Sequence, residues 1–238
     1  RGYTIRVLDP VVEQDATGAP RLRRLGSYNE TKNGHSVLLK LQYGAFSMLF
    51  GGDLNEPAEK FLLQHYTGLQ KFPKKGTAAY DDMVAAAQQT FRSEVMKSCH
   101  HGSEKVTDAF LAAFNPAAFV ISSGDEEGHV HPRPDLLGRL GGFGRGGAPV
   151  ILSTELQRST RAFENREVVD KLLADVDALA NGVSAVKLEK IKRDIRYLAR
   201  SNVEVHGAIY LKTDGERLIT AFRIESGSET EKWFCFRY

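Results

Sequence analysis

The chain has 238 residues, of which 42% are hydrophobic, and its 32 lysines and arginines nearly balance its 30 aspartates and glutamates. This composition is typical of a folded globular protein and excludes a disordered, collagen-like or coiled-coil chain. The formal charge of +2 is too small to indicate a polyanionic partner by itself. Two cysteines and the absence of an apolar run of about 20 residues predict a cytoplasmic protein with neither a disulfide framework nor a membrane segment.

The first part of the chain is predicted to be mainly extended. Short stretches rich in β-branched and aromatic residues predict strands at residues 3–8, 37–41 and 46–50. Residues 43–45 form so short a connection that the second and third of these strands are predicted to pair as a hairpin. The polar residues 15–32, which include glycine and proline, are predicted to be a loop.

Strands and helices are predicted to alternate in the middle of the chain. Apolar residues at helical spacing predict helices, and short apolar runs predict strands. The predicted elements are a helix at 58–65, a strand at 95–99, a helix at 106–114, and strands at 118–122 and 150–153. This alternation indicates an α/β fold built in layers.

The last third of the chain contains a helical segment between strands. Apolar residues at helical spacing predict a helical hairpin at residues 165–200, with Asn181 and Gly182 at its turn. Strands are predicted at 205–211 and 218–224, around a turn at Asp214 and Gly215. The chain therefore divides into residues 1–160, a helical insertion at 161–204, and residues 205–238, whose strands complete the domain of the first part.

Two polar sequences follow predicted strands and are candidates for a functional site. His100 and His101 come directly after one strand, and Asp53 follows two glycines at the end of another. A rigid strand end positions such side chains well, imidazole is a common metal ligand, and a carboxylate can bridge two metal ions. Taken alone, Asp53 could instead cap the helix that follows it. Cys99, which alternates with His100 along the strand, is predicted to point into the core.

These sequences resemble motifs of the metallo-β-lactamase fold hydrolases, in particular of the branch found in the hydrolase domain of competence DNA-uptake proteins. The motifs, in chain order, are Asn33-Gly34-His35-Ser36, Gly51-Gly52-Asp53, His100-His101-Gly102-Ser103, and Ser122-Ser123-Gly124 with His131-Pro132. The resemblance covers residues 3–160 and resumes at 205–224. It implies an α/β fold of the metallo-β-lactamase type, an αββα sandwich of which this chain forms the second half, with the helical hairpin inserted.

The resemblance also implies roles for four residues. Asp53 would bridge two divalent metal ions, zinc or manganese, and His101 would bind one of them. His100 and His131 would face the substrate, where an imidazole can donate a proton to the leaving oxygen. Two such metal ions activate water for attack on a phosphodiester or another ester. The implied activity is that of a metal-dependent hydrolase, a phosphodiesterase or nuclease with nucleic acid as its partner.

The chain departs from this family in one major respect. The principal ligand motif of the family, His-x-His-x-Asp-His, is absent from all 238 residues. Asp53 and His101 alone are too few ligands for a zinc or manganese site. We therefore expect this chain to be the C-terminal half of a hydrolase, inactive alone, whose partner is an N-terminal half from the same gene or a separate chain. The apolar sheet face that a half-sandwich exposes would pair with that partner.

Further substrate contacts and two other functions stay open at this point. Ser103 is predicted to support the turn or to contact the substrate. Arg145 lies in a glycine-rich loop expected beside the cleft and is predicted to contact a phosphate of the substrate. One alternative is a catalytically inactive binding module, because residues 187–200 carry six lysines and arginines against two acidic residues. The other alternative is an esterase or lactonase of the same superfamily.

Overall fold

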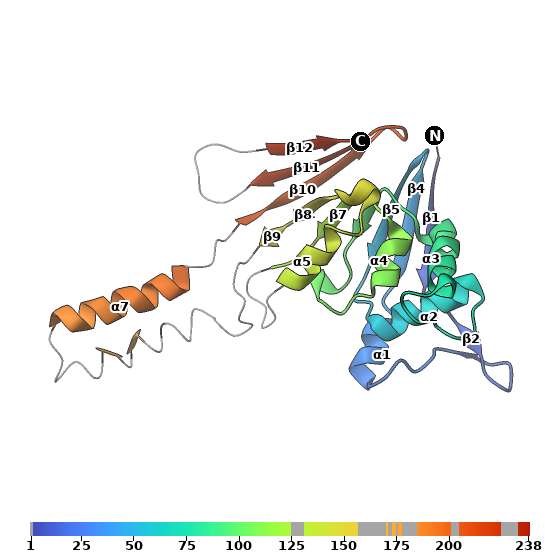
Figure 1. The fold of residues 1–238 in the computed structure, drawn as a ribbon, viewed down its shortest axis with the longest axis horizontal. Coiled ribbons are helices and arrows are strands. Elements are labelled where there is room, and N and C mark those ends of the chain that lie inside the picture. Colours follow the sequence, from blue (N-terminus) through green and yellow to red (C-terminus); the bar gives the residue numbers. More distant parts are fainter. Residues whose placement is uncertain are drawn as a thin grey trace.

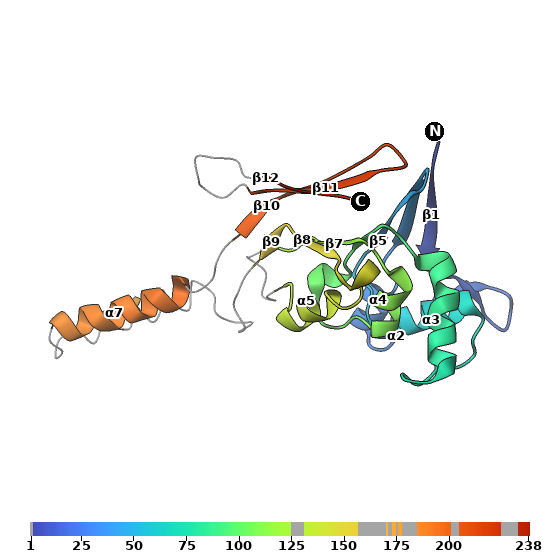
Figure 2. The ribbon, with the colours of Figure 1, turned by 45° about the horizontal axis from the view of Figure 1, so that its top comes forward.

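The computed structural model describes residues 2–124, 131–156, 170, 173–174, 176–177, 185–200, 205–224 and 233–238. These residues form a mixed α/β structure around a mostly parallel central sheet. Helices α2 to α5 cover one face of this sheet, and a smaller sheet lies over part of the other face (Figure 1, Figure 2). The predicted layered α/β class is confirmed.

The central sheet has six strands in the order β1, β4, β5, β6, β7 and β8. Their bounds are β1 Tyr3–Asp9, β4 Leu38–Tyr43, β5 Phe46–Gly51, β6 Val95–Lys97, β7 Ala118–Ile121 and β8 Val150–Ser153. β1, β4 and β5 pair antiparallel, whereas β5, β6, β7 and β8 pair parallel. All six agree with the strands predicted from the sequence, and β4 and β5 form the predicted hairpin.

The smaller sheet has the order β12, β11, β10 and β9. Its strands are β9 Glu155–Leu156, β10 Val205–Thr213, β11 Leu218–Ile224 and β12 Trp233–Arg237. β10 and β11 form the predicted hairpin around Asp214 and Gly215, whereas β12 is not among the predicted elements. Leu218 packs against Met48 and Val120 of the central sheet, so a second hydrophobic core lies between the two sheets.

The larger hydrophobic core lies between the central sheet and its helices. These helices are α2 Glu56–Thr67, α3 Ala78–Phe91, α4 Asp108–Phe114 and α5 Pro134–Leu140. The rings of Phe91, Phe110 and Phe114 pack together, with centroids 4.7 to 5.8 Å apart. α2 and α4 confirm the predicted helices, but α3 and α5 are not predicted. α3 buries Met83, Ala87 and Phe91 among many alanines and polar residues, so its apolar periodicity is weak in the sequence.

The prediction of a loop at residues 15–32 is wrong in part. β2 Glu13–Gln14 and β3 Pro20–Arg21 form a short hairpin, and α1 Tyr28–Gly34 begins inside the predicted loop. The Ser27 hydroxyl accepts a hydrogen bond from the Glu30 N–H, and the Glu30 carboxylate accepts one from the Ser27 N–H. This reciprocal capping starts the helix without an apolar pattern. Only Gly34 of α1 is buried, which explains why hydrophobic periodicity does not predict it.

The helical part of the predicted insertion includes α7 Ala185–Arg200, which lies away from the layered part of the molecule (Figure 1). Residues 170, 173–174 and 176–177 are also helical, whereas the rest of the predicted first helix lies outside the described residues. Lys190 and Arg193 of α7 are exposed. In the described part of the chain, no helix combines the length and the apolar character that crossing a membrane requires.

Strand β1, at one end of the central sheet, extends past the smaller sheet (Figure 2). Tyr3, Ile5 and Val7 alternate along β1 and are 69%, 56% and 63% exposed. Ile5 pairs with Leu41, which pairs with Met48 of the core between the sheets. Because paired residues lie on the same face of a sheet, β1 presents its three apolar side chains on the face that the smaller sheet covers elsewhere.

Candidate functional site

Most of the predicted site residues lie at one edge of the central sheet. Because β5, β6 and β7 run parallel, the segments that follow them leave the sheet at the same edge. Asp53 follows β5, and His100 and His101 follow β6. In open α/β sheets this carboxyl edge is where ligands commonly bind. We call Asp53, His100, His101 and His131 the strand-end site.

Asp53 is placed by the close approach of two other segments to the end of β5. A Cβ atom on Gly51 would lie 2.6 Å from the Cys99 Sγ, and one on Gly52 would lie 2.5 Å from the Cβ of Ser36. The Ser36 Oγ accepts a hydrogen bond of 2.9 Å from the Asp53 N–H. The two glycines are therefore required because they leave room for these neighbours. Cys99 is fully buried, as predicted.

Asp53 does not cap helix α2, so this alternative role is wrong. The capping residue is Asn55, whose side-chain oxygen accepts a hydrogen bond of 3.2 Å from the Ala58 N–H. The Asp53 side chain is instead 39% exposed and turns toward His101. Its carboxylate is therefore available at the sheet edge.

His101 directs one ring nitrogen toward Asp53. Its Nδ1 lies 2.8 Å from the carbonyl oxygen of Ser122, and because a carbonyl only accepts, Nδ1 donates this hydrogen bond. The other ring nitrogen, Nε2, lies 3.6 Å from the Asp53 Oδ1. A backbone carbonyl commonly fixes the tautomer of a metal-binding histidine in this way. Adjacent strand ends thus bring together one imidazole nitrogen and one carboxylate.

The turn that carries the two histidines has a strained backbone. His100, His101 and Gly102 have φ values of 46°, 52° and 89°. These values lie in the left-handed region, which residues other than glycine rarely adopt. The His100 N–H donates to the carbonyl of Gly52 at 2.9 Å, and the Ser103 N–H donates to the carbonyl of His100 at 2.9 Å. Surrounding contacts of this kind maintain strain, which often occurs at functional sites.

The segment that begins at His131 packs against the same turn. The Arg133 N–H donates to the carbonyl of Gly102 at 2.9 Å, and a Cβ atom on Gly102 would lie 2.7 Å from the Pro132 Cβ. The rings of His100 and His131 have centroids 6.1 Å apart and an interplanar angle of 66°. The Nδ1 of His100 is buried and makes no hydrogen bond within the described residues. The structure therefore places both predicted proton donors at the strand-end site.

Ser103 lies next to the strand-end site but faces inward. The residue is 5% exposed, and its Oγ accepts a hydrogen bond of 3.4 Å from the Lys105 N–H. The hydroxyl thus supports the turn, and its burial disfavours the predicted contact with a substrate.

The structure does not bring Arg145 to the strand-end site, so its expected position beside the cleft is wrong. The Arg145 N–H donates to the carbonyl of Pro116, just before β7, and its Nη2 lies 3.2 Å from the Glu94 Oε1, just before β6. The Glu94 Oε2 accepts from the N–H and hydroxyl of Ser47 at 2.7 and 2.8 Å. Arg145 therefore stabilises the opposite edge of the sheet, where the parallel strands begin.

Two side chains that belong to none of the motifs, Glu59 and Arg139, hold the segment between the His-His turn and α4. Glu59 of α2 is fully buried, and its Oε2 accepts a hydrogen bond of 2.6 Å from the Thr107 N–H. Burial raises the pKa of Glu59 to about 8, so this carboxyl is protonated at neutral pH. Arg139 of α5 donates to the carbonyls of Glu104 and Val106 at 3.1 and 2.5 Å. The sequence signal for Glu59 is its place inside an otherwise apolar helical stretch.

Ser36 and Ser122 also support the site without having been assigned a role. Both belong to the sequence motifs that resemble the hydrolase family, but their partners Asp53 and His101 are 17 and 21 residues away along the chain. Contacts over such separations are visible only in the folded protein.

The donor atoms of the strand-end site fit part of a metal centre. Imidazole nitrogen and carboxylate oxygen are both accepted by zinc and manganese. Within the residues that the structure describes, no group of three or more histidines, cysteines, aspartates and glutamates is arranged to hold a metal ion. A metal bound by Asp53 and His101 therefore needs ligands in addition to those described.

Comparison with known proteins does not assign the chain to a family. No family model, no curated protein and no solved structure matches it. The structure defines the chain as a mixed α/β protein with histidines and a carboxylate gathered at the carboxyl edge of its central sheet.

Proposed function

We propose that this protein is a metal-dependent hydrolase that cleaves phosphodiesters, with nucleic acid as its substrate class. The observation that carries the proposal is the distance of 3.6 Å between His101 Nε2 and Asp53 Oδ1, with the His101 ring oriented by the hydrogen bond from Nδ1 to the Ser122 carbonyl. An imidazole nitrogen and a carboxylate that face each other can both bind one divalent cation. The resemblance of the flanking sequences to metallo-β-lactamase fold motifs supports the substrate class.

The residues of the strand-end site take separate roles in this proposal. Asp53 and His101 would hold divalent ions, zinc or manganese, and Asp53 would bridge two of them. Two divalent ions supply stabilisation for the negative charge that develops on the phosphoryl oxygens. The rings of His100 and His131 lie beside this pair, where an imidazole can donate a hydrogen bond or a proton to the leaving oxygen.

The remaining ligands are proposed to come from a partner segment that packs on the exposed apolar face of β1. Tyr3, Ile5 and Val7 are more than half exposed there, next to the core between the two sheets. Burying the part of each side chain that is still exposed would stabilise an interface by about 1–2 kcal/mol. The partner would be the N-terminal half of the same hydrolase, and the two halves together would form an αββα sandwich of the metallo-β-lactamase type.

The test is the metal content of protein produced from its natural gene, measured by elemental analysis beside Asp53→Ala and His101→Ala variants. We expect about two divalent metal ions per molecule, with less metal in both variants. Asp82→Ala, which removes an exposed carboxylate from α3, is the matched control and should retain the metal. Wild-type protein without metal, or equal metal content in all four proteins, would contradict the proposal.

Substrate screening then separates the phosphodiesterase from an esterase or lactonase with the same metal site. Cleavage of single-stranded and double-stranded nucleic acid is compared with cleavage of an aryl ester and a lactone, each with and without a chelator. Chelator-sensitive cleavage of nucleic acid supports the phosphodiesterase. Chelator-sensitive cleavage of the ester or lactone alone contradicts it.

The position of α7 supports a second candidate function, a nucleic-acid-binding module without catalysis. α7 lies away from the layered part of the molecule, and Lys190 and Arg193 are exposed on it (Figure 1). Cationic side chains on an accessible helix can contact phosphates. This candidate predicts nucleic-acid binding by protein that contains no metal, whereas the hydrolase predicts that Asp53→Ala abolishes cleavage and leaves binding through α7 intact.

A further inference from the structure

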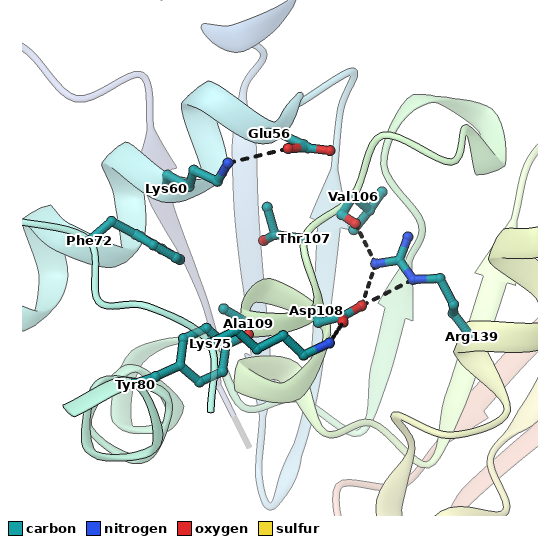
Figure 3. A pocket seen from close by; sticks show the side chains of 10 residues that line it. All are labelled: Glu56, Lys60, Phe72, Lys75, Tyr80, Val106, Thr107, Asp108, Ala109 and Arg139. Carbon is teal, nitrogen blue, oxygen red and sulfur yellow. Dashed lines mark hydrogen bonds and ion pairs between the residues drawn. The ribbon is translucent and has the colours of Figure 1, made fainter. Parts of the chain in front are cut away.

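A cavity of about 330 Å³ lies on the helical side of the molecule, outside the strand-end site (Figure 3). Its walls come from α2, from the segment between α2 and α3, and from the starts of α3 and α4, and Arg139 of α5 closes one side. Its volume lies at the lower end of the range of about 300–1,000 Å³ that small-molecule sites occupy. The cavity is open to solvent over most of its surface, so it can contact one side of a single small ligand.

One wall of the cavity is aromatic. The rings of Phe72 and Tyr80 have centroids 6.3 Å apart and an interplanar angle of 80°, so one ring meets the edge of the other. Lys60 Nζ lies 6.0 Å from the centroid of Phe72. An aromatic ligand can pack on this wall, and the nearby ammonium provides a counter-charge for an anionic group attached to that ring.

The charged groups around the cavity leave an excess of positive charge. Lys60, Lys75 and Arg139 line it together with the carboxylates of Glu56 and Asp108. Lys60 Nζ lies 3.3 Å from the Glu56 Oε2, and Lys75 is paired with Asp108. Three cations against two carboxylates give a formal charge of +1 in a site that would receive a ligand.

The three cations differ in how much freedom they retain. Arg139 donates to Asp108 through Nε and Nη2 and to backbone carbonyls through Nη1 and Nη2, so its guanidinium is fixed as part of the wall. The Lys60 and Lys75 side chains are 44% and 70% exposed, and each ammonium has three N–H donors, of which its carboxylate partner can use one at a time. Lys60 points toward Glu56 and Lys75 toward Asp108 (Figure 3), and their exposure leaves both side chains room to turn toward an anion in the cavity.

We propose that this cavity binds a nucleoside monophosphate, as a free nucleotide or as the phosphorylated end of a strand. The base would pack against Phe72 and Tyr80, and the phosphate would accept hydrogen bonds from Lys60 and Lys75. This binding needs no metal ion and does not involve Asp53 or His101. It therefore goes beyond the proposed hydrolase function and stands or falls independently of it.

The test is calorimetric titration of the protein in chelator-containing buffer with adenosine 5′-monophosphate, adenosine, inorganic phosphate and a 5′-phosphorylated dinucleotide. We expect the monophosphate or the dinucleotide to bind at least about tenfold more tightly than adenosine and inorganic phosphate. Only these two ligands have both a base for the aromatic wall and a phosphate for the two lysines. The tighter of the two identifies the source of the ligand. The proposal is overturned if neither the monophosphate nor the dinucleotide binds, or if both bind no more tightly than inorganic phosphate.

Variants then locate the site. Lys60→Gln and Phe72→Leu should each weaken binding of the nucleotide by about tenfold, the loss expected for one charged hydrogen bond or one aromatic contact. Lys74→Gln is the matched control, because Lys74 is exposed in the same segment but does not line the cavity. Equal weakening by Lys74→Gln would show only a general attraction of anions and overturn the assignment. Asp53→Ala should bind the nucleotide as the wild type does.

Discussion

The buried carboxyl of Glu59 predicts an unusual dependence of stability on pH. Glu59 has no exposed surface, and its contact with the Thr107 N–H does not compensate for the loss of solvation, so its pKa rises from 4.5 to about 8. The unfolded chain releases this proton above its ordinary pKa, whereas the folded protein retains it until about pH 8. The folded state therefore binds more protons in this window, and stability falls as the pH rises through it.

The magnitude follows from the size of the pKa shift. Each pH unit within the window changes the unfolding free energy by about 1.4 kcal/mol per retained proton. Between pH 5.5 and 7.5 Glu59 should therefore remove about 2.5 kcal/mol of stability. Glu59→Gln retains an oxygen that can accept the Thr107 N–H but cannot ionise, so this part of the pH dependence should disappear.

The assay is urea unfolding followed by far-ultraviolet circular dichroism at a series of pH values. Burial also raises the pKa of Asp9 to about 6, so Asp9 makes the unfolding free energy fall with rising pH in both the wild type and Glu59→Gln. The difference between wild type and Glu59→Gln therefore isolates Glu59. Glu56→Gln, on the same helix but partly exposed, is the control. If the difference in unfolding free energy between wild type and Glu59→Gln stays constant from about pH 5.5 to 7.5, the reasoning is refuted, whatever the size of that difference.

Three further predictions concern the turn, its supports and the projecting helix. Gly102→Ala should destabilise the protein by about 2–3 kcal/mol in urea unfolding, because it combines a left-handed φ with a steric overlap. Gly146→Ala, which has a similar φ but open space around its Cβ, should cost only about 1 kcal/mol, and equal losses would contradict a steric role for Gly102. Arg139→Gln should cost about 2 kcal/mol and speed amide exchange in residues 103–107, and unchanged exchange there would contradict its anchoring role. Replacing Lys190 and Arg193 by glutamine should reduce the salt dependence of nucleic-acid binding by up to about two units of log–log slope, and an unchanged slope would exclude α7 from the interface.

Elements with a strong local pattern could be predicted from the sequence. Strands β4 to β8 and helices α2 and α4 bury apolar side chains, and β1 carries a regular apolar alternation although Tyr3, Ile5 and Val7 are exposed. In all of these elements the apolar pattern is visible in the order of residues. α1 depends on reciprocal capping by Ser27 and Glu30, and α3 buries only a few side chains. Hydrophobic periodicity carries little information in such elements, so it does not predict α3 and it predicts a loop where α1 begins.

The candidate site could be predicted in part for a similar reason. Asp53 and His101 each follow a buried strand, and parallel pairing of β5 and β6 places both ends at one edge. Arg145 lies in a loop that precedes a strand, and in a parallel sheet such loops lie at the edge opposite to the strand ends that carry Asp53 and His101. Its contacts with Glu94 and Pro116, at the starts of β6 and β7, place it at that opposite edge. The direction of each strand thus decides which loops share a site.

The order of residues alone predicts which segments form the central strands and which polar groups follow them. This is possible because the apolar character of side chains and their alternation along a strand are local properties of the sequence. The hydrogen bond of His101 Nδ1, the raised pKa of Glu59 and the cavity beside Phe72 arise only in the folded protein. Each of these depends on atoms from segments far apart in the chain, whose distances and shared burial are fixed when the layers pack together.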